Sequence, residues 1–244
     1  MNSRILLCCY IAALFCLPPT STVHAQDSEE RAYDLAVYTP RFLFSGNVAR
    51  SLYAKKIATA LSQSTGLTIR GRAFTRRSDL NNFISNGRID LVLADIGIVA
   101  SKTRKFHILA SGTGPEGSTP SYAVLSHKAF KGIQTLKGKR LGLPDASFNE
   151  VALVSNIPFE SEVSIKSFFG AIRWAHDVGE LIGWLKTGRV DCAVGYAYWG
   201  RKQGLKVVST LRGVPLPVLA AVRKRIKRED LELLTGRISR QGLD

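Results

Sequence analysis

The sequence predicts an α/β protein of two similar lobes, each with a mixed, mostly parallel sheet, helices on both faces, and two crossover hinges between them. One turn occurs twice, as Asn86-Gly-Arg-Ile-Asp90 and as Thr187-Gly-Arg-Val-Asp191. An amphipathic run precedes each copy and an apolar run follows it, which indicates a helix leading into a buried strand. The copies lie about a hundred positions apart, a spacing typical of a duplicated domain and not of a solenoid.

Strands are expected where short apolar runs lie between turn signals. Before the first crossover these runs are 35–38, 67–70, 89–93 and 106–110. After it they are 122–126, 140–143 and 190–194, and the segment 162–172 covers one more strand and its approach. The run 218–222 is a strand that returns to the first lobe. The segments 111–121 and 212–217 are rich in Gly and Pro and are the candidate crossovers, with hinges near 118–121 and 213–217.

Helices are expected between these strands. A helix over 48–64 would be capped by Asn47 or Ser45 and end near Gly66. Ser78 is the expected cap of the helix that leads to Gly87. In the second half, short helices are expected within 133–139 and after 149, and Asp177 caps a helix in a variant of the capping box, with Glu180 three residues on. A last helix is expected over 229–235.

The first 25 residues have the pattern of a secretory signal peptide. Arg4 precedes an apolar core at 5–17, and the small residue Ala25 favours cleavage after it. The chain is then a periplasmic protein whose first lobe comprises 26–118 and 216–244 and whose second lobe comprises 119–215. Lipidation at Cys16 is a weaker alternative, because the residue before it, Phe15, is bulky.

Charge and cysteine content narrow the classes of function. Cleavage leaves only Cys192, inside a predicted buried strand, so it is expected to be a core residue and no internal disulfide is predicted. The formal net charge of the whole chain is +15. Export argues against nucleic acid as a partner and favours acidic ligands or an anionic membrane surface. The densest basic cluster, 223–228, is read as a solvated face beside the last helix.

Loops beyond the carboxyl ends of parallel strands usually form the ligand site of such sheets. The rule selects 38–47, 94–97, 144–149 and 195–199, two from each lobe. They carry the candidate ligand-binding residues Tyr38, Thr39, Arg41, Asp95, Ser147, Asn149 and Tyr196.

Four short motifs resemble a known family. Ser121-Tyr-Ala-Val-Leu-Ser126, Leu136-Lys-Gly-Lys-Arg140, Ala175-His-Asp177 and Gly188-Arg-Val-Asp191 stand in the order seen in phosphonate/phosphite/phosphate-type substrate-binding proteins of ABC importers. The resemblance spans 35–222 and implies the type II periplasmic binding fold, with a small anionic or zwitterionic ligand held between two lobes by hinge closure.

The resemblance also implies partners and one more site residue. Family members hold their anion with a Ser/Thr-rich helix start, where this chain offers only Ser147 and Asn149, and they place a histidine, here His176, near the anion. The implied partner is the membrane permease of an ABC importer, and the protein is expected to be a monomer without cofactor or metal. A sensing module that reports its ligand to a membrane kinase is the alternative.

Each candidate also has a structural interpretation. Tyr38 could be a core residue, Arg41 a solvated loop residue, and Asp95 the cap of the next turn. His176 could be a neighbour of the helix cap, and Tyr196, with Tyr198 and Trp199, could pack under a hinge. An enzyme is not expected, because the sequence has no Gly-x-Ser-x-Gly elbow, no clustered Cys/His spacing and no P-loop or Rossmann glycine motif.

Overall fold

The structure is a computed structural model that describes residues 31–100, 104–112, 121–144, 164–211 and 216–241. The expected signal peptide, most of both expected crossovers, and Ser147 and Asn149 lie outside these ranges. No helix among the described residues is long and apolar enough to cross a bilayer.

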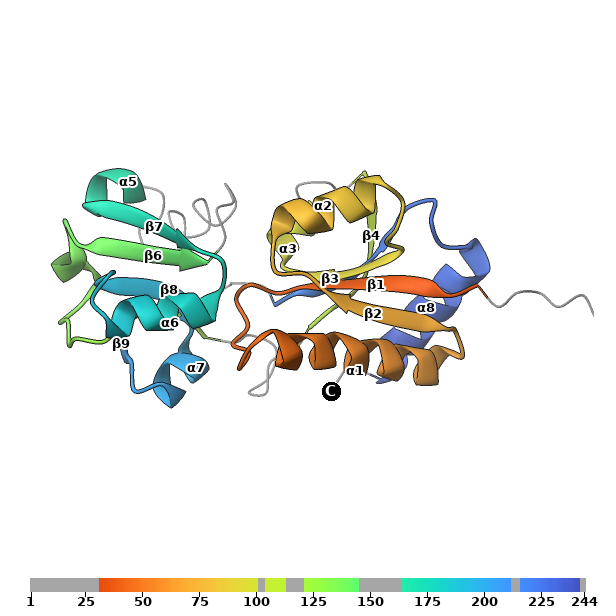
Figure 1. Cartoon of the computed structure of the whole chain (residues 1–244), viewed down its shortest axis with the longest axis horizontal. Coiled ribbons are helices and arrows are strands. Elements are labelled where there is room, and N and C mark those ends of the chain that lie inside the picture. The colour runs from red at the N-terminus through yellow and green to blue at the C-terminus, as the bar shows by residue number, and fades with distance from the viewer. Residues whose placement is uncertain (1–30, 101–103, 113–120, 145–163, 212–215, 242–244) are drawn as a thin grey trace, which may run out of the picture. The chain divides into compact units, whose positions relative to one another are not determined.

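Two five-stranded sheets organise the described chain (Figure 1). The first has the order β2-β1-β3-β10-β4 and the second the order β7-β6-β8-β5-β9. The first sheet comprises β1 (Tyr33–Tyr38), β2 (Ile69–Ala73), β3 (Leu91–Ala94), β4 (Phe106–Ser111) and β10 (Val218–Val222). The second comprises β5 (Tyr122–Ser126), β6 (Arg140–Pro144), β7 (Ala171–Ala175), β8 (Cys192–Tyr196) and β9 (Lys206–Leu211).

Both sheets follow one plan. In each, four strands run in the same direction and one strand is antiparallel to both of its neighbours. The reversed strand is β10 in the first sheet and β5 in the second. Each of these follows a crossover in the chain and enters a sheet that the preceding strand did not belong to. The prediction of two mixed, mostly parallel sheets with two crossovers is therefore confirmed.

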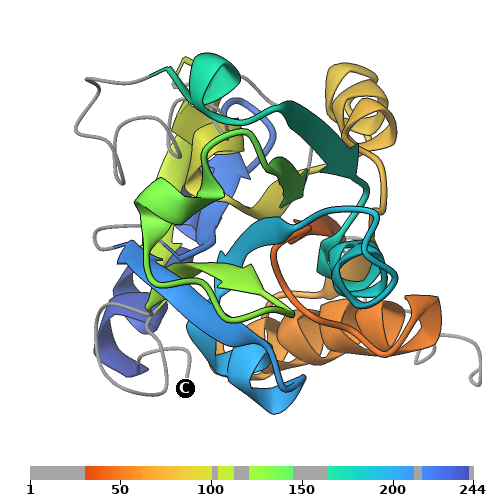
Figure 2. The same ribbon diagram turned by 90° about the vertical axis from the view of Figure 1, so that its left-hand side faces the viewer.

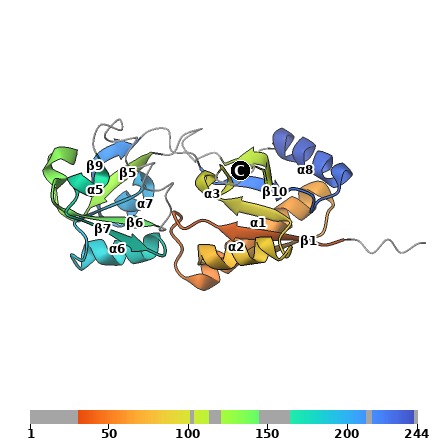
Figure 3. The same ribbon diagram turned by 90° about the horizontal axis from the view of Figure 1, so that it is seen from above.

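Helices pack on both faces of the first sheet. Helices α2 (Arg77–Ser85) and α3 (Ile96–Ala100) contribute to one buried cluster, and α1 (Asn47–Thr65) and α8 (Arg228–Gln241) to another (Figures 1 and 3). Strand β1 alternates between the two clusters, with Ala36 in the first and Leu35 and Val37 in the second. A strand buried on both faces needs a continuous apolar run, and the run at 35–38 is the feature that predicted this strand.

The second sheet has its own core. The 3₁₀ turn η1 (Ile133–Leu136) and α5 (Ile165–Phe168) are short, whereas α6 (Val178–Lys186) packs on β6, β7 and β8, and α7 (Ala197–Lys202) on β5, β8 and β9 (Figure 2). Cys192 is fully buried in this core, and burial raises the pKa of its thiol to about 12. Its interpretation as a core residue is confirmed.

Several predicted boundaries are wrong. Helix α1 begins after Gly46 with no side-chain cap, so neither Asn47 nor Ser45 caps it. The helix ends at Gly66 as predicted, and that glycine has the left-handed conformation. The residue before α2 is Arg76, and Ser78 lies inside that helix. Two segments predicted as loops, 94–97 and 195–199, contain the starts of α3 and α7. The segment 162–172, predicted as a strand and its approach, contains α5 before β7. The last helix, α8, is longer than the predicted 229–235.

The duplicated turn is the same structure in both sheets. Gly87 and Gly188 have φ values of 66° and 71°, which glycine adopts at least cost. The next residue, Arg88 or Arg189, donates its N–H to the carbonyl five positions earlier, at 2.9 and 2.8 Å. The predicted C-terminal glycines are therefore confirmed.

The aspartate that ends each turn anchors the adjacent strand. Asp90 Oδ2 accepts the N–H of Asp34, and Asp191 Oδ2 accepts the N–H of Arg140, both at 2.9 Å. In return, Asp90 and Asp191 donate their N–H groups to the carbonyls of the same two residues, also at 2.9 Å. The repeated aspartate has a structural role that fixes where β3 joins β1 and where β8 joins β6.

Candidate functional site

Strand order places two predicted site loops beside each other. Tyr38 at the end of β1 pairs with Ala94 at the end of β3, and the strands are parallel. Thr39 and Asp95, the residues that follow, therefore leave the sheet at the same edge. Asp95 also accepts the N–H of Ile98 at 2.9 Å through its backbone carbonyl, which starts α3.

Arg41 and Asp95 form a buried ion pair at this edge. The distance between Arg41 Nε and Asp95 Oδ2 is 3.6 Å, and the two side chains are 5% and 7% exposed. The interpretation of Arg41 as a solvated loop residue is therefore wrong. Burying a charge costs much free energy unless an opposite charge compensates it. Here the Arg41 guanidinium and the Asp95 carboxylate compensate each other.

Aromatic residues of the second sheet adjoin this pair. The guanidinium carbon of Arg41 lies 5.4 Å from the ring centre of Tyr122, which is itself 5.1 Å from the ring of Tyr196. Phe42 packs edge-on to Tyr196 at 5.9 Å. The loop after β1 thus contacts both the end of β3 in its own sheet and the facing ends of β5 and β8.

Tyr38 ends β1, Thr39 begins the loop after it, and both are buried. Tyr38 is 2% exposed and belongs to a core cluster of the first sheet, as its structural interpretation holds. Thr39 is equally buried, and its Oγ1 has no hydrogen-bond partner among the described residues. A buried hydroxyl without a partner is unusual and costs free energy, so the Thr39 hydroxyl is available to form a hydrogen bond with a ligand at this edge.

His176 lies at the start of α6, outside the buried group. It is exposed, and its N–H donates to Glu180 Oε2 at 2.8 Å, while Asp177 accepts the N–H of Glu180 at 3.1 Å. The predicted capping-box variant is present, and His176 takes part in it through its backbone. Two residues on, Val178 donates its N–H to the carbonyl of Pro40 at 3.1 Å, so His176 borders the same loop.

Trp199 is a packing residue. It is fully buried, and a Cβ added to Gly195 would lie 1.7 Å from its ring. Tyr198, by contrast, is 45% exposed and stacks on Tyr196 at 6.0 Å. Burial raises the pKa of the Tyr198 hydroxyl, and likewise that of Tyr53, so both phenols stay protonated.

The structure thus joins Arg41, Asp95 and Tyr196, with Tyr38 and Thr39 beside them. Sequence reasoning missed Tyr122, Phe42 and Arg50, of which Arg50 pairs with Asp177 at 2.5 Å. The run Arg-Phe-Leu-Phe at 41–44 was a usable signal, because three large apolar residues seldom occupy a solvated loop. Among the described residues, no group of three or more His, Cys, Asp or Glu side chains is placed to hold a metal ion.

Comparisons with known proteins identify the fold. No protein-family model matches the sequence, and no curated protein matches it. The structure is similar to a binding-protein component of an ABC phosphonate transporter from Pseudomonas aeruginosa, with a TM-score of 0.69 and 13% identity over 88% of this chain and 76% of that one.

Two further structures are similar at comparable coverage. An ancestral arginine-binding protein bound to arginine has a TM-score of 0.59 and 18% identity over 87% of this chain and 95% of that one. A periplasmic domain of BvgS from Bordetella pertussis has a TM-score of 0.60 and 13% identity over 86% and 88%. The chain has the two-lobed fold of the type II periplasmic binding proteins, as the sequence motifs predicted.

Proposed function

We propose that this protein is an extracytoplasmic solute-binding protein of an ABC importer, which closes its two lobes around a small ligand and presents the closed form to a membrane permease. The fold is compatible with this role, and two of the structures compared above are described as binding proteins. The observation that carries the proposal is the Arg41–Asp95 pair, buried at the carboxyl edge of the first sheet beside Tyr122 and Tyr196 of the second. We infer binding and not catalysis.

The two charges favour a zwitterionic ligand within the predicted class of small anions and zwitterions. A guanidinium suits a carboxylate or phosphonate, and a carboxylate suits an ammonium group. A dianion such as phosphate would place like charge beside Asp95, which is 5% exposed and poorly screened by solvent. An amino acid or an aminophosphonate satisfies both residues, while Tyr122 and Tyr196 provide apolar contact with polar tips.

Closure follows from contacts that only the closed form offers. Residues of the loop after β1 contact the second sheet through Arg41 and Phe42, and Arg50 of α1 pairs with Asp177 of α6. A ligand that adds contacts to both sheets shifts the population toward the closed form by its differential affinity. Ser147, Asn149 and His176 remain proposed contacts from the second lobe, and 26–118 with 216–244 and 119–215 remain the proposed lobe boundaries.

A thermal-shift screen tests the proposal. Amino acids, aminophosphonates, phosphonates, phosphate and sulfonates would each be added to the purified protein, and a ligand at about a hundred times its dissociation constant adds about 2.7 kcal/mol of stability. Calorimetric titration of a hit should show binding lost in Arg41→Met and Asp95→Asn and kept in Lys55→Gln, an exposed position on α1. Absence of any hit, or equal affinity in all three variants, would contradict this site.

Sensing is the second candidate. A similar fold occurs in a periplasmic domain of BvgS, so the same closure is compatible with a role that transports nothing. Neighbouring genes separate the two: a permease and an ATPase favour import, and a sensor kinase favours sensing. The proposed location is the periplasm in both cases, reached through cleavage after Ala25, and amino-terminal sequencing of the exported protein tests it.

A further inference from the structure

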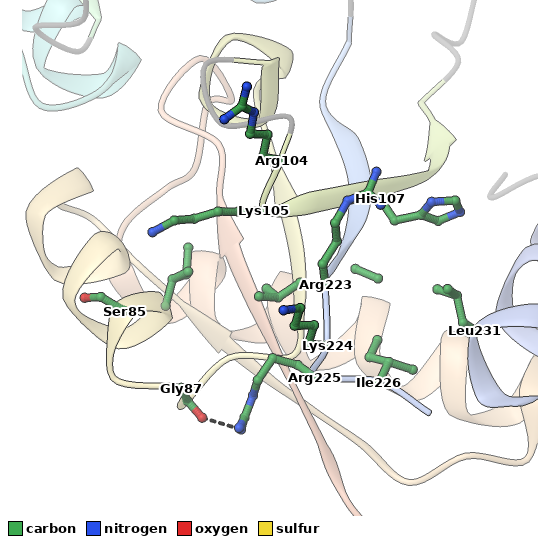
Figure 4. Close-up of a pocket in the computed structure, with 13 residues that line it drawn as sticks. Ser85, Gly87, Arg104, Lys105, His107, Arg223, Lys224, Arg225, Ile226 and Leu231 are labelled. Carbon is green, nitrogen blue, oxygen red and sulfur yellow. Dashed lines mark hydrogen bonds between the residues drawn. The ribbon is translucent and has the colours of Figure 1, made fainter. Parts of the chain in front are cut away.

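A pocket lies at the edge of the first sheet opposite to Arg41 and Asp95. Its volume is about 670 Å³, and it is lined by the end of α2, the segment before β4, the residues after β10 and the start of α8 (Figure 4). Ala221 and Val222, the last residues of β10, pair there with His107 and Phe106 at the start of β4. Arg41 and Asp95 lie beyond the other ends of these strands, so this pocket is separate from the proposed ligand site.

The lining combines basic side chains with an apolar floor. No Asp or Glu lines the pocket. Five basic residues do: Arg104, Lys105, Arg223, Lys224 and Arg225. Apolar side chains line the rest: Ile84, Ala221, Val222, Ile226 and Leu231. A volume of this size falls within the usual range for small-molecule sites, and the mixture suits a ligand with an anionic and an apolar part.

Two of the basic side chains, those of Arg223 and Arg225, have partners within the protein. Arg225 is fixed: it donates to the carbonyl of Gly87, and its Nε lies 3.3 Å from Asp90 Oδ1, a carboxylate that Arg31 also approaches at 3.6 Å (Figure 4). Arg223 donates through Nε to the carbonyl of Phe106 at 2.9 Å.

Three other cations have no such engagement. Arg104, Lys105 and Lys224 are exposed, and the described part of the chain gives none of them an ion pair. Lys224 has a φ of 66° and is the one residue other than glycine with positive φ among those described. Such a conformation costs free energy in a lysine, and here it reverses the chain between Arg223 and Arg225 so that both line the pocket.

The duplication provides an internal comparison. Strand β5 occupies in the second sheet the place of β10 in the first, and it continues as His127-Lys-Ala-Phe130 where β10 continues as Arg223-Lys-Arg-Ile226. The aspartates of the duplicated turn also differ: in the described part of the chain Asp191 forms an ion pair with one arginine, Arg140, whereas Asp90 is approached by two, Arg31 and Arg225. The basic turn is therefore a property of the first lobe and not of the shared plan.

We propose that this pocket binds an organic phosphate whose phosphoryl group meets the side chains of Arg104, Lys105 and Lys224 and whose apolar group rests on Ile226 and Leu231. Arginine suits the oxygens of a phosphate, and a phosphate monoester carries more than one negative charge at neutral pH, which matches a lining without any acid. The phosphoryl group can belong to a soluble ester or to a lipid head group, since both present the same oxygens and an apolar neighbour.

The test uses 1-naphthyl phosphate and lipid vesicles with the purified protein. Calorimetric titration should show binding of 1-naphthyl phosphate at least about tenfold tighter than that of inorganic phosphate, because only the ester reaches the floor. The double variant Arg104→Gln/Lys105→Gln should weaken binding at least about tenfold. The matched control Lys128→Gln/Lys206→Gln removes two exposed cations from the second lobe and should bind as the parent does.

Co-sedimentation separates the two sources of the phosphoryl group. Binding to vesicles with phosphatidic acid, whose head group is a phosphate monoester, but not to vesicles of phosphatidylcholine alone, lost in Arg104→Gln/Lys105→Gln and kept in the control, identifies a lipid head group. Binding of the naphthyl ester without vesicle binding identifies a soluble ester. Neither kind of binding, or equal loss in both double variants, overturns the proposal. Arg104→Gln/Lys105→Gln should leave ligand binding at the Arg41–Asp95 site unchanged, so failure of this pocket and failure of the proposed ligand site are distinguishable.

Discussion

Arg50 of α1 and Asp177, the residue that caps α6, form an ion pair in which Arg50 Nη2 and Asp177 Oδ2 are 2.5 Å apart. The residues are 127 positions apart, and their helices pack on different sheets. Arg50 is 8% exposed in its side chain and Asp177 is 26% exposed, so solvent screens the pair only in part. Together with the hydrogen bond from Val178 to Pro40, it links the first lobe to the start of α6.

A double-mutant cycle measures this link. Asp177→Asn keeps a side chain able to cap α6 and removes the charge, and Arg50→Met removes the partner at similar length. We expect a coupling free energy of about 1 kcal/mol between the two changes in urea denaturation. Asp177→Ala should cost about 1 kcal/mol more than Asp177→Asn, because it also removes the cap.

The exposed pair Arg228–Glu232 on α8 is the control for that cycle. Its side chains are 91% and 68% exposed, and it joins adjacent turns of one helix. Pairs of this kind contribute a few tenths of a kcal/mol. Equal coupling in the two cycles would mean that the Arg50–Asp177 link adds nothing beyond a surface ion pair.

Removing one partner of the buried Arg41–Asp95 pair should destabilise the protein strongly. Either Arg41→Met or Asp95→Leu leaves an uncompensated charge in the interior, at a cost of about 3 kcal/mol. The double variant Arg41→Met/Asp95→Leu should be more stable than the sum of the two losses predicts, because no charge is then left buried. Chemical denaturation of all four proteins checks this, and strict additivity would show that the two side chains do not interact.

Gly195 should tolerate no side chain while Trp199 is present. A Cβ there would lie 1.7 Å from the indole, so Gly195→Ala should cost about 3 kcal/mol, at the upper end of measured overpacking. In a Trp199→Leu background the same change should cost far less. Gly183→Ala on α6, where a Cβ meets nothing within 4 Å, should instead stabilise the helix by about 0.5 kcal/mol. The melting temperatures of these four variants, compared with that of the parent, test these expectations.

Asp191 should make stability depend on acid. Hydrogen bonding from Arg140 lowers the pKa of Asp191 to about 2, so the folded state favours the ionised carboxylate. The resulting stabilisation is fully present above the ordinary carboxyl pKa near 4 and is lost as pH falls through about 2. Between those values the parent should lose stability more steeply than Asp191→Asn. Arg140→Met should flatten the profile in the same way, and a parent-like profile in Arg140→Met would refute Arg140 as the cause.

Local signals in the sequence were sufficient for the elements and for the duplication. The strands 122–126 and 218–222 have the predicted bounds, and Gly66, Gly87 and Gly188 end their helices as predicted, because apolar period and left-handed glycine are properties of a few neighbouring residues. Helix starts were less predictable: Gly46 and Arg76 precede α1 and α2 without any side-chain cap, so Ser45, Asn47 and Ser78 were misleading.

The sequence by itself determined two α/β lobes of one plan, since every residue that defines the duplicated turn acts on its own helix or on the adjacent strand. Only the tertiary structure decided which polar residues are buried. Arg41 looked like a solvated loop residue and is 4% exposed, because Asp95 from a neighbouring strand and Tyr122 from the other sheet meet it there. The cost of burying a charge depends on partners that folding brings from far along the chain, and no local pattern records them.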